Sequence, residues 1–379
     1  MTTLRESFDG CRIIITCGPG GIGKTTSAAA MATAIAASEA LRVLVLTVDP
    51  ARRLADALGI SGIGNEPQVV PLDGPGELSV AMLDPQSSWD ALIRRQAADE
   101  ETAERILRNV LYQNLTRRFV QSHDYIAMER LHELVTRDAW DLIIVDTPPT
   151  RNALDFLDAA SRMADFFSSR FLKWIIAPTR SGVAGLATKP LTYIADRILG
   201  NQFLTDITEF FVLLNSMYDG FVERAREVES LLQDDTTKFL VVSTPEAIPT
   251  REAAFFDGEL RKRNLRVGGW LVNRMLPQSL GSESVTTGVA VLAQADLNAL
   301  ATQLAADPSM LSEVRDRMVT LAEQFAILAD NEQRMARDLA TGPTPVFAAY
   351  TAEGEIDTLT GVTSFGRRLL LAERVLKFD

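Results

Sequence analysis

The sequence is poor in the residues that build disulfide frameworks and metal clusters. It contains only two cysteines, Cys11 and Cys17, and two histidines, His123 and His132. No CxxC pair is present, so neither a disulfide framework nor a cysteine-based zinc site is expected. The histidines fall in a helical pattern without metal-ligand spacing. We therefore expect no zinc and interpret both cysteines as core residues.

Long apolar runs and an excess of basic residues are also missing. No window approaches the ~20 uncharged apolar residues that span a membrane, and the N-terminus, MTTLRESFDG, lacks the apolar core of a signal peptide. The net charge of −12 disfavours nucleic-acid binding, which needs a basic face. These absences predict a cytoplasmic protein without a nucleic-acid partner.

What is present is a series of short apolar segments that alternate with helical patterns. Strands are expected within residues 11–16, 42–50, 77–85, 140–150, 238–246 and 267–275. Continuous apolar strands separated by helices predict an α/β fold with a doubly wound, mostly parallel sheet that is covered on both faces. Ligands bind such sheets at the carboxyl ends of the strands. Asp49, Asp146, Glu246 and Asn273 lie at these ends.

The first predicted strand leads into GPGGIGKTT, residues 18–26, which matches the phosphate-loop pattern G-x-x-x-x-G-K-[ST]. Glycines let backbone amides curl around phosphate oxygens, and the following helix adds its positive end. Lys24 is expected to bridge the β- and γ-phosphates, and the Thr25 hydroxyl to bind Mg²⁺. The predicted nucleotide-binding residues of the loop are Gly18, Gly20, Gly21, Ile22, Gly23, Lys24, Thr25 and Thr26.

Two aspartates at strand ends complete the predicted chemistry. Asp146 ends the apolar strand of LIIVDTPPT, the Walker B arrangement, and is expected to hold Mg²⁺ through water. Asp49, in TVDPARR, is placed to orient and deprotonate the attacking water. Asp49 also suits a helix N-cap before ARRLADAL; both roles are compatible, and the catalytic role is favoured. Asp49 and Lys24 are thus the predicted catalytic residues.

Two helical tracts, residues 87–138 and 151–235, interrupt the sheet pattern. We interpret them as one inserted helical subdomain, and residues 1–86, 139–150 and 236–379 as the P-loop ATPase domain. The second tract is rich in aromatic residues, which suits either a groove for an apolar helix or a core and subunit interface. The second reading is favoured because apolar helix faces usually pack.

Residues 308–341 carry an apolar stripe with alternating steps of three and four residues. This spacing predicts one face of a long helix that packs antiparallel against a neighbouring helix. The polar, small-residue segment SLGSESVTTG, residues 279–288, is predicted to be a loop. The stripe consists of Leu311, Val314, Met318, Leu321, Phe325, Leu328, Met335 and Leu339.

Three segments, GGIGKTT, DPARRLADALG and DLIIVDTPPTRNALDFLD, resemble the arsenite-pump, or ArsA-like, ATPase family. This family belongs to the deviant-Walker dimeric P-loop ATPases and includes the ATPases that target tail-anchored proteins. SHDYIAMERLHEL resembles most closely the actinobacterial anion-transporting ATPase subgroup. The resemblance implies ATP and Mg²⁺ as cofactors. It also implies a homodimer or a heterodimer with a related ATPase chain, coupled to a membrane transporter or a client protein and peripheral to the membrane through that partner.

The resemblance also assigns residues. It makes Asp49 the switch I residue that activates water, and Asp146 and Thr147 the start of switch II. Glu246 and Asn273 match nucleotide-contacting positions, with the Asn273 amide suited to the adenine edge. Residues 350–362, YTAEGEIDTLTGV, resemble the loop that closes over adenine.

Departures from the family pattern bear on mechanism. Pro19 occupies the slot of the signature lysine that reaches the phosphates of the other subunit, and the cysteines of the zinc clamp and of the arsenite site are missing. One hypothesis is that Arg52, Arg53 or Arg151 replaces the lost charge; the alternative is that these arginines are solvated helix residues. A sister subunit could also supply the charge.

The function predicted from these residues is a Mg²⁺-dependent switch ATPase in which hydrolysis rearranges two chains. The alternative is a slow-hydrolysing, nucleotide-gated chaperone or scaffold that binds an apolar client. A membrane- or DNA-positioning switch fits poorly, because the C-terminal RRLLLAERVLKFD is not a basic membrane helix and the chain is acidic.

Overall fold

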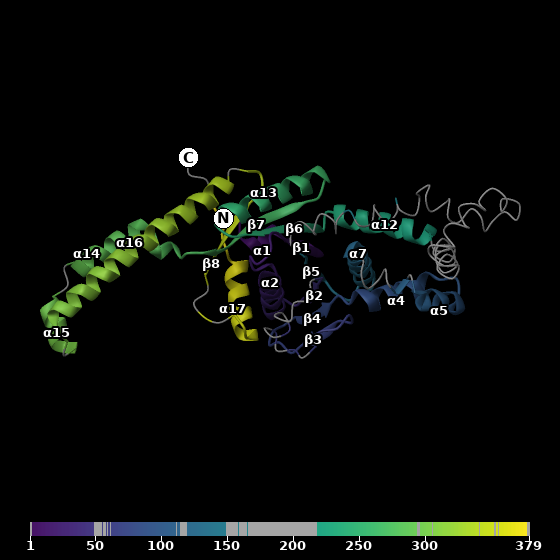
Figure 1. The fold of residues 1–379 in the computed structure, drawn as a ribbon, viewed down its shortest axis with the longest axis horizontal. Helices are drawn as coiled ribbons and strands as arrows, with labels where there is room; N and C mark the ends of the chain where they lie inside the picture. The colour runs from purple at the N-terminus through teal and green to yellow at the C-terminus, as the bar shows by residue number, and fades with distance from the viewer. Residues whose placement is uncertain are drawn as a thin grey trace, which may run out of the picture.

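The computed structural model describes residues 2–48, 62–110, 120–148, 218–293, 296–304, 306–340, 342–351 and 356–376, with residues 55, 58, 60, 112, 113, 158, 165 and 354. One sheet forms the body of this part of the chain (Figure 1). The sheet order is β3-β4-β2-β5-β1-β6-β7-β8. Neighbouring strands run parallel except for the β3–β4 pair.

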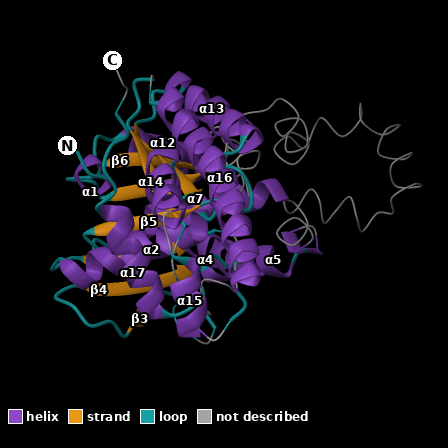
Figure 2. Ribbon diagram, turned by 90° about the vertical axis from the view of Figure 1, so that its left-hand side faces the viewer, coloured by secondary structure: helices purple, strands orange, loops and turns teal. Residues whose placement is uncertain are grey.

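All six predicted strands are confirmed: β1 (Ile13–Cys17), β2 (Arg42–Thr47), β4 (Glu77–Met82), β5 (Leu142–Asp146), β6 (Thr237–Ser243) and β7 (Val267–Met275). Two strands at the ends of the sheet were not predicted, β3 (Gln68–Val70) and β8 (Val346–Tyr350). Both are short, so their sequence pattern carries little signal. Figure 2 shows β6, β5, β4 and β3 in succession across the sheet.

The strands divide their side chains between two cores. Ile13, Ile15 and Cys17 of β1 belong to one core, and Ile14 belongs to the other. This alternation follows from the two-residue repeat of a strand. Because both faces are covered, both sets are apolar, and this is why the sequence shows continuous rather than alternating apolar runs.

One face is covered by α1 (Leu4–Ser7), α2 (Lys24–Ser38) and α17 (Leu359–Leu370). The alanine-rich α2 buries nearly its whole length, including Ala28, Ala30 and Ala34. α17 packs closely on it: a Cβ atom at Gly366 would lie 1.8 Å from the carbonyl oxygen of Ala30. Small residues on both helices thus set the distance between them.

The other face is covered by α4 (Pro85–Gln96), α5 (Glu100–Arg108), α7 (Val120–Thr136), α12 (Tyr218–Gln233) and α13 (Ala247–Lys262). Asp84 and Asp99 cap α4 and α5 by accepting backbone hydrogen bonds from Ser87 and Thr102. The helices within 87–138 share one core with the sheet. The aromatic-rich part of the predicted subdomain, up to residue 217, lies almost wholly outside the described residues, so the inserted subdomain stays a prediction.

After β7 the chain forms η2 (Gln278–Leu280), α14 (Ser282–Ala293), α15 (Leu297–Leu304) and α16 (Pro308–Leu339). The long helix was predicted, but the loop over 279–288 was wrong, because most of it is η2 and α14. The small polar residues there are compatible with a helix: Thr286 and Thr287 donate to the carbonyl oxygens of Ser282 and Glu283. Among the described residues, no helix is long and apolar enough to cross a membrane.

The predicted packing of the α16 stripe is also wrong from Val314 to Leu328, where its members are exposed. Met318 is 55 % exposed and Leu321 is 53 % exposed. The helix instead buries a row of small residues, Ala326, Ala329 and Ala336. Alanine lets α16 approach its neighbours closely, so the small-residue face packs and the larger side chains stay outside.

Candidate nucleotide-binding site

The phosphate-loop motif forms the turn between β1 and α2, as the sequence predicts. Gly18 and Gly23 have positive φ angles of 145° and 94°, which side-chain-bearing residues rarely adopt. A Cβ atom at Gly18 would also lie 2.2 Å from the carbonyl oxygen of Val242. α2 begins at Lys24, so the positive end of its dipole faces the loop. The turn has the form of an anion cradle.

Lys24 is buried, with 7 % of its surface exposed. Its Nζ atom donates a hydrogen bond of 2.9 Å to the carbonyl oxygen of Pro19. Pro19 is itself buried. The Lys24 side chain thus extends across the loop to Pro19. An anion bound by the backbone N–H groups of the loop would lie close to the lysine's positive charge.

Three side chains converge where the carboxyl ends of β2 and β5 meet the first turn of α2. The Thr25 hydroxyl donates to Asp146 Oδ2 at 2.6 Å, and the Thr47 hydroxyl donates to the same atom at 3.2 Å. Asp146 is 1 % exposed. Carboxylate and hydroxyl oxygens are the ligands that Mg²⁺ prefers, so the donor set fits the predicted metal.

Sequence reasoning missed Thr47 and the hydroxyl groups that fix the neighbouring strand ends. Thr147 Oγ1 donates to the Thr16 carbonyl at 2.8 Å, and Thr16 Oγ1 donates to the Val145 carbonyl at 3.1 Å. β2, β5 and β1 are neighbours in the sheet. The available signal was a threonine within one residue of the carboxyl end of each of these strands.

Asn273 connects β7 to the phosphate loop. Its Nδ2 atom donates to the Ile22 carbonyl at 2.9 Å, and its Oδ1 atom accepts from the Arg274 backbone amide at 2.9 Å. Arg274 has a positive φ of 62°, and the register of β7 against β8 shifts at this point. The turn in the backbone directs Asn273 at the loop. The predicted adenine contact of Asn273 stays a prediction.

Glu246 lies at the entry of α13, with an extended backbone and no capping hydrogen bond from its side chain. It is exposed. Burial raises the pKa of Glu332 on α16, and the negative charge of Glu246 adds to that shift. Glu246 therefore lies near α16, and its predicted nucleotide contact stays a prediction.

The predicted catalytic Asp49 lies outside the described residues, as do Arg52, Arg53 and Arg151. The chain just before Asp49 is placed, because the Val48 amide donates to the Asp146 carbonyl at 3.0 Å. The segment that leads to Asp49 therefore starts beside the Walker B aspartate.

The cysteines lie in or beside β1, as predicted. Cys17 is buried and donates to the Leu240 carbonyl, and burial raises the pKa of both the Cys17 and the Cys11 thiol. His132 faces Glu227 at 3.3 Å, while burial lowers its pKa. The His123 side chain lies outside the described residues.

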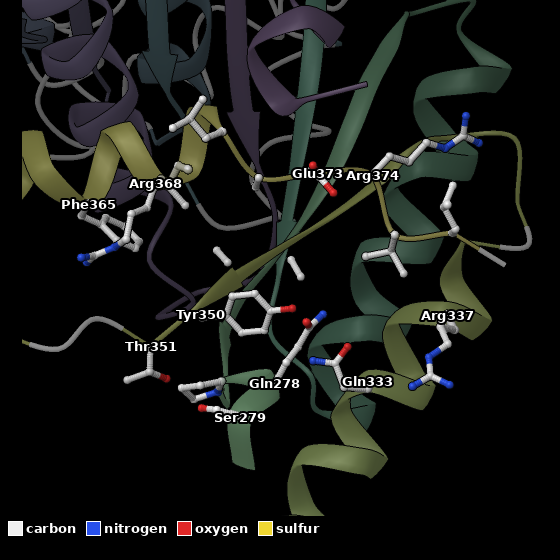
Figure 3. A pocket seen from close by; sticks show the side chains of 18 residues that line it. Gln278, Ser279, Gln333, Arg337, Tyr350, Thr351, Phe365, Arg368, Glu373 and Arg374 are labelled. Atoms are coloured by element: carbon white, nitrogen blue, oxygen red, sulfur yellow. The ribbon is translucent and has the colours of Figure 1, made fainter. Parts of the chain in front are cut away.

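A separate cavity of about 840 Å³ runs beside β8 (Figure 3). Gln278, Gln333 and Tyr350 gather at one end of it, whereas Arg368 and Arg374 extend away in opposite directions. Tyr350 and Thr351, the first residues of the predicted adenine loop, line this cavity. The last four residues of that predicted loop, 359–362, are helical: Thr358 caps α17, which begins at Leu359.

Comparison with known proteins agrees with this site. A profile described as anion-transporting ATPase matches residues 11–287. The ATPase ASNA1 homolog of Entamoeba dispar is 26 % identical over 265 residues, covering 69 % of this chain and 75 % of that protein. ATPase get3 of Aspergillus terreus is 27 % identical over 289 residues, covering 74 % and 76 %. The putative arsenical pump-driving ATPase 2 of Aquifex aeolicus is 24 % identical over 275 residues, covering 71 % and 81 %.

Proposed function

From the premise that the chain belongs to the anion-transporting ATPase family, we propose that it is a Mg²⁺-dependent switch in which ATP hydrolysis changes the arrangement of two chains. ATPase activity is the property that the family and the names of its relatives share. The proposal adds the roles of individual residues, the pairing of chains and the coupling to a partner.

The phosphate loop is the proposed phosphate site. Backbone N–H groups between Gly18 and Thr26, except at Pro19, which has none, surround the phosphates. Lys24 leaves the Pro19 carbonyl to contact the β- and γ-phosphate oxygens. Asn273 stabilises the loop through Ile22. Glu246, Asn273 and the segment after Tyr350 are proposed to contact the rest of the nucleotide.

Thr25 and Asp146 are the proposed Mg²⁺ residues. Their side chains meet at 2.6 Å; Thr25 would hold the ion directly and Asp146 would hold it through water. Mg²⁺, when bound there, neutralises charge on the phosphates. Thr47 holds the Asp146 carboxylate in place, so the metal-binding oxygens are positioned before nucleotide arrives.

Asp49 is the proposed base that orients the attacking water and accepts its proton. The negative charge on the phosphoryl group in the transition state is stabilised by a positively charged side chain, and Pro19 provides no such charge. Arg52, Arg53 and Arg151 follow the two switch segments and are the proposed substitutes, in the same chain or across the pair. Alanine variants of each test this: unchanged turnover in all three would exclude it.

The observation that carries the proposal is the contact between Thr25 of the phosphate loop and Asp146 of Walker B. It brings both halves of a phosphate and metal site together: the phosphate loop that follows β1, and the aspartate that ends the adjacent strand β5. The test is ATP turnover per chain across a range of protein concentrations. Turnover that rises with concentration supports a paired site, and turnover independent of concentration contradicts it.

The same assay separates the alternative, a nucleotide-gated chaperone or scaffold. Tight ATP binding with saturated turnover below about one per minute, against the about 1–10³ s⁻¹ of typical enzymes, would favour that alternative. Affinity capture with an ATP analogue identifies whether the second chain is identical or a related ATPase, and whether a transporter or client is retained.

A further inference from the structure

Within the part of the chain that the structure describes, the outer edge of β8 is paired only over the amino-terminal half of the strand. β8 is the last strand in the sheet order, so one of its edges pairs with β7 and the other faces outward. On the outer edge, Arg374 lies opposite Phe347 in an antiparallel bridge. The Val375 amide donates to the Val346 carbonyl at 2.8 Å.

The segment that pairs with β8 turns away before it covers the rest of this edge. The Ala372 amide donates to the Leu369 carbonyl and the Leu371 amide to the Arg367 carbonyl, so the chain just before the pairing segment is bonded to the end of α17. The cavity of about 840 Å³ runs along this edge and is lined by residues 348–351 of the strand (Figure 3). A strand edge that borders a cavity can accept one more strand.

The backbone groups that face the cavity follow from the alternation along the strand. The Val346 carbonyl faces the outer edge, whereas the Thr351 amide donates to the Met275 carbonyl of β7 at 2.8 Å. Even-numbered residues of β8 therefore direct their N–H and C=O groups outward. The backbone groups of Ala348 and Tyr350, which line the cavity, are the ones to which an added strand would bond.

One wall of the cavity is apolar. Phe365 and Leu369 of α17 line it and belong to the same core as Ala349. Successive residues of a strand point to opposite faces, and Ala348 accordingly belongs to the other core. Residues that lie opposite one another on paired strands share a face. The residue of an added strand beside Ala349 would therefore direct its side chain to the α17 wall, where an apolar side chain fits.

The other wall is polar. Gln278, Gln333 and Tyr350 gather there (Figure 3), and Tyr350 packs against the core that contains Ala348. Arg337 follows Gln333 by one turn of α16. The Gln333 Nε2 atom is buried and has no hydrogen-bond partner in the described part of the chain. This atom is a donor, so an acceptor oxygen on a bound molecule would satisfy it.

The charge around the cavity favours an acidic guest. Its charged lining residues are three arginines, Arg337, Arg368 and Arg374, and one glutamate, Glu373, in a chain whose net charge is −12. Guanidinium groups form strong, directional pairs with carboxylates. A carboxylate beside Ala348 would lie on the wall that carries Arg337, and it would offer the oxygen that the neighbouring amide donor needs.

We infer that this cavity receives an extended acidic segment of a partner protein, which adds to the outer edge of β8 and enlarges the eight-stranded sheet. The side chains of the segment alternate. Acidic ones face Gln333 and Arg337 of α16, and apolar ones face Phe365 and Leu369 of α17. The inference goes beyond the proposed function, because it names the chemistry of a partner's segment and needs no nucleotide.

The test uses the full chain without nucleotide and a fluorescein-labelled eight-residue peptide of alternating glutamate and valine. One control peptide has the same composition in two blocks, four glutamates followed by four valines, and another has lysine in place of glutamate. Gln333→Glu places a carboxylate in the polar wall at nearly constant volume, and its melting curve checks the fold. Gln324→Glu makes the same change at an exposed site of α16 outside the cavity.

Fluorescence anisotropy should show that the alternating acidic peptide binds the wild-type chain and that both control peptides bind at least about tenfold more weakly. Gln333→Glu should raise the Kd of the acidic peptide at least about tenfold, because like charges that face one another in an interface are costly. Gln324→Glu should leave it within about twofold. Hydrogen exchange at the Tyr350 amide should slow when the peptide is bound, since strand addition pairs that group.

Four results would overturn the inference: no binding of the alternating acidic peptide, equal binding of the block peptide, equal binding by Gln333→Glu, or unchanged exchange at Tyr350. Free glutarate that binds as tightly as the peptide would also overturn it, because the cavity would then hold a small anion rather than a strand. Lys24→Ala should abolish ATP binding and leave peptide binding within about twofold. This variant separates a failure of the inference from a failure of the proposed ATPase switch.

Discussion

The Nζ atom of Lys24 donates a 2.9 Å hydrogen bond to the carbonyl oxygen of Pro19. The contact joins the lysine of the phosphate loop to the residue that occupies the signature position. Its acceptor belongs to the main chain, so any residue at position 19 can provide it. The identity of the side chain at this position is therefore free to change without loss of the Lys24 contact.

The Pro19→Lys variant tests how much the absence of a lysine at position 19 lowers ATP turnover. If two chains pair across their sites, a lysine here should raise the ATP turnover at saturation by about tenfold or more, which is still well below the about 10³–10⁵ that a supplied arginine contributes in other NTPases. The KM for ATP should change little, because Lys24 keeps its contact. Pro19→Ala, which adds no charge, should match wild type; equal turnover in the lysine and alanine variants would contradict the prediction.

Thr25→Val should remove the Mg²⁺ dependence of ATP binding, because it deletes the hydroxyl that meets Asp146 at 2.6 Å. Calorimetric titration with Mg²⁺ and with EDTA measures this dependence. We expect Mg²⁺ to tighten binding to wild type and to tighten it at least tenfold less for the variant. Thr33→Val is the matched control: it lies on the same helix and its hydroxyl donates only to the Ala29 carbonyl in the structure. A loss of Mg²⁺ dependence in both variants would show a general effect on α2.

Asn273→Asp should destabilise the phosphate loop. The substitution replaces the donor to the Ile22 carbonyl by a carboxylate oxygen in a site that is 6 % exposed. An unsatisfied buried polar group costs about 1–3 kcal/mol, and more when charged. Urea unfolding should show this loss, and ATP affinity should fall with it. Asn273→Ala removes the donor without adding charge and should be milder; an aspartate variant as stable as wild type would refute the role assigned to this amide.

Gly366→Ala should be strongly destabilising, because the added Cβ atom would lie 1.8 Å from the Ala30 carbonyl oxygen. That atom belongs to the backbone of α2, so relief requires moving the helix that begins at Lys24. Overpacking of this kind costs about 1–3 kcal/mol or more, and ATP affinity should fall as well. Gly258→Ala on α13 is the matched control: nothing lies within 4 Å of its added Cβ atom, and the change should stabilise by about 0.5–1 kcal/mol. Thermal unfolding of the pair should move in opposite directions.

The sequence predicted an element correctly wherever its residue pattern had a single physical explanation. β1, β2 and β5 are continuous apolar runs because both faces are buried, and the phosphate loop requires glycine at Gly18. The stripe on α16 is different, because its spacing predicts a helix without saying which of two apolar faces packs inward. Contacts such as Asn273 to Ile22 join residues far apart in the chain, and no local pattern encodes them. Thr47 was missed because a threonine at a strand end has no distinctive spacing.

Acid should weaken the connection between β2 and β5 through Asp141. Two hydrogen bonds from Arg42 lower the pKa of Asp141 from 3.8 to about 2. The bond from the Arg42 side chain has the larger effect, and the bond from its backbone amide has the smaller one. A carboxyl group with a depressed pKa contributes stability above its unfolded-state value and loses it as the pH falls through its folded-state value. The loss should therefore occur between pH 3.8 and about 2.

Asp141→Asn should be less stable than wild type at pH 7, and the two unfolding midpoints should converge near the lower limit. Arg42→Gln removes the same pair from the other side and should give the same flattened profile. Parallel profiles for wild type and both variants would show that the pair contributes nothing to acid stability.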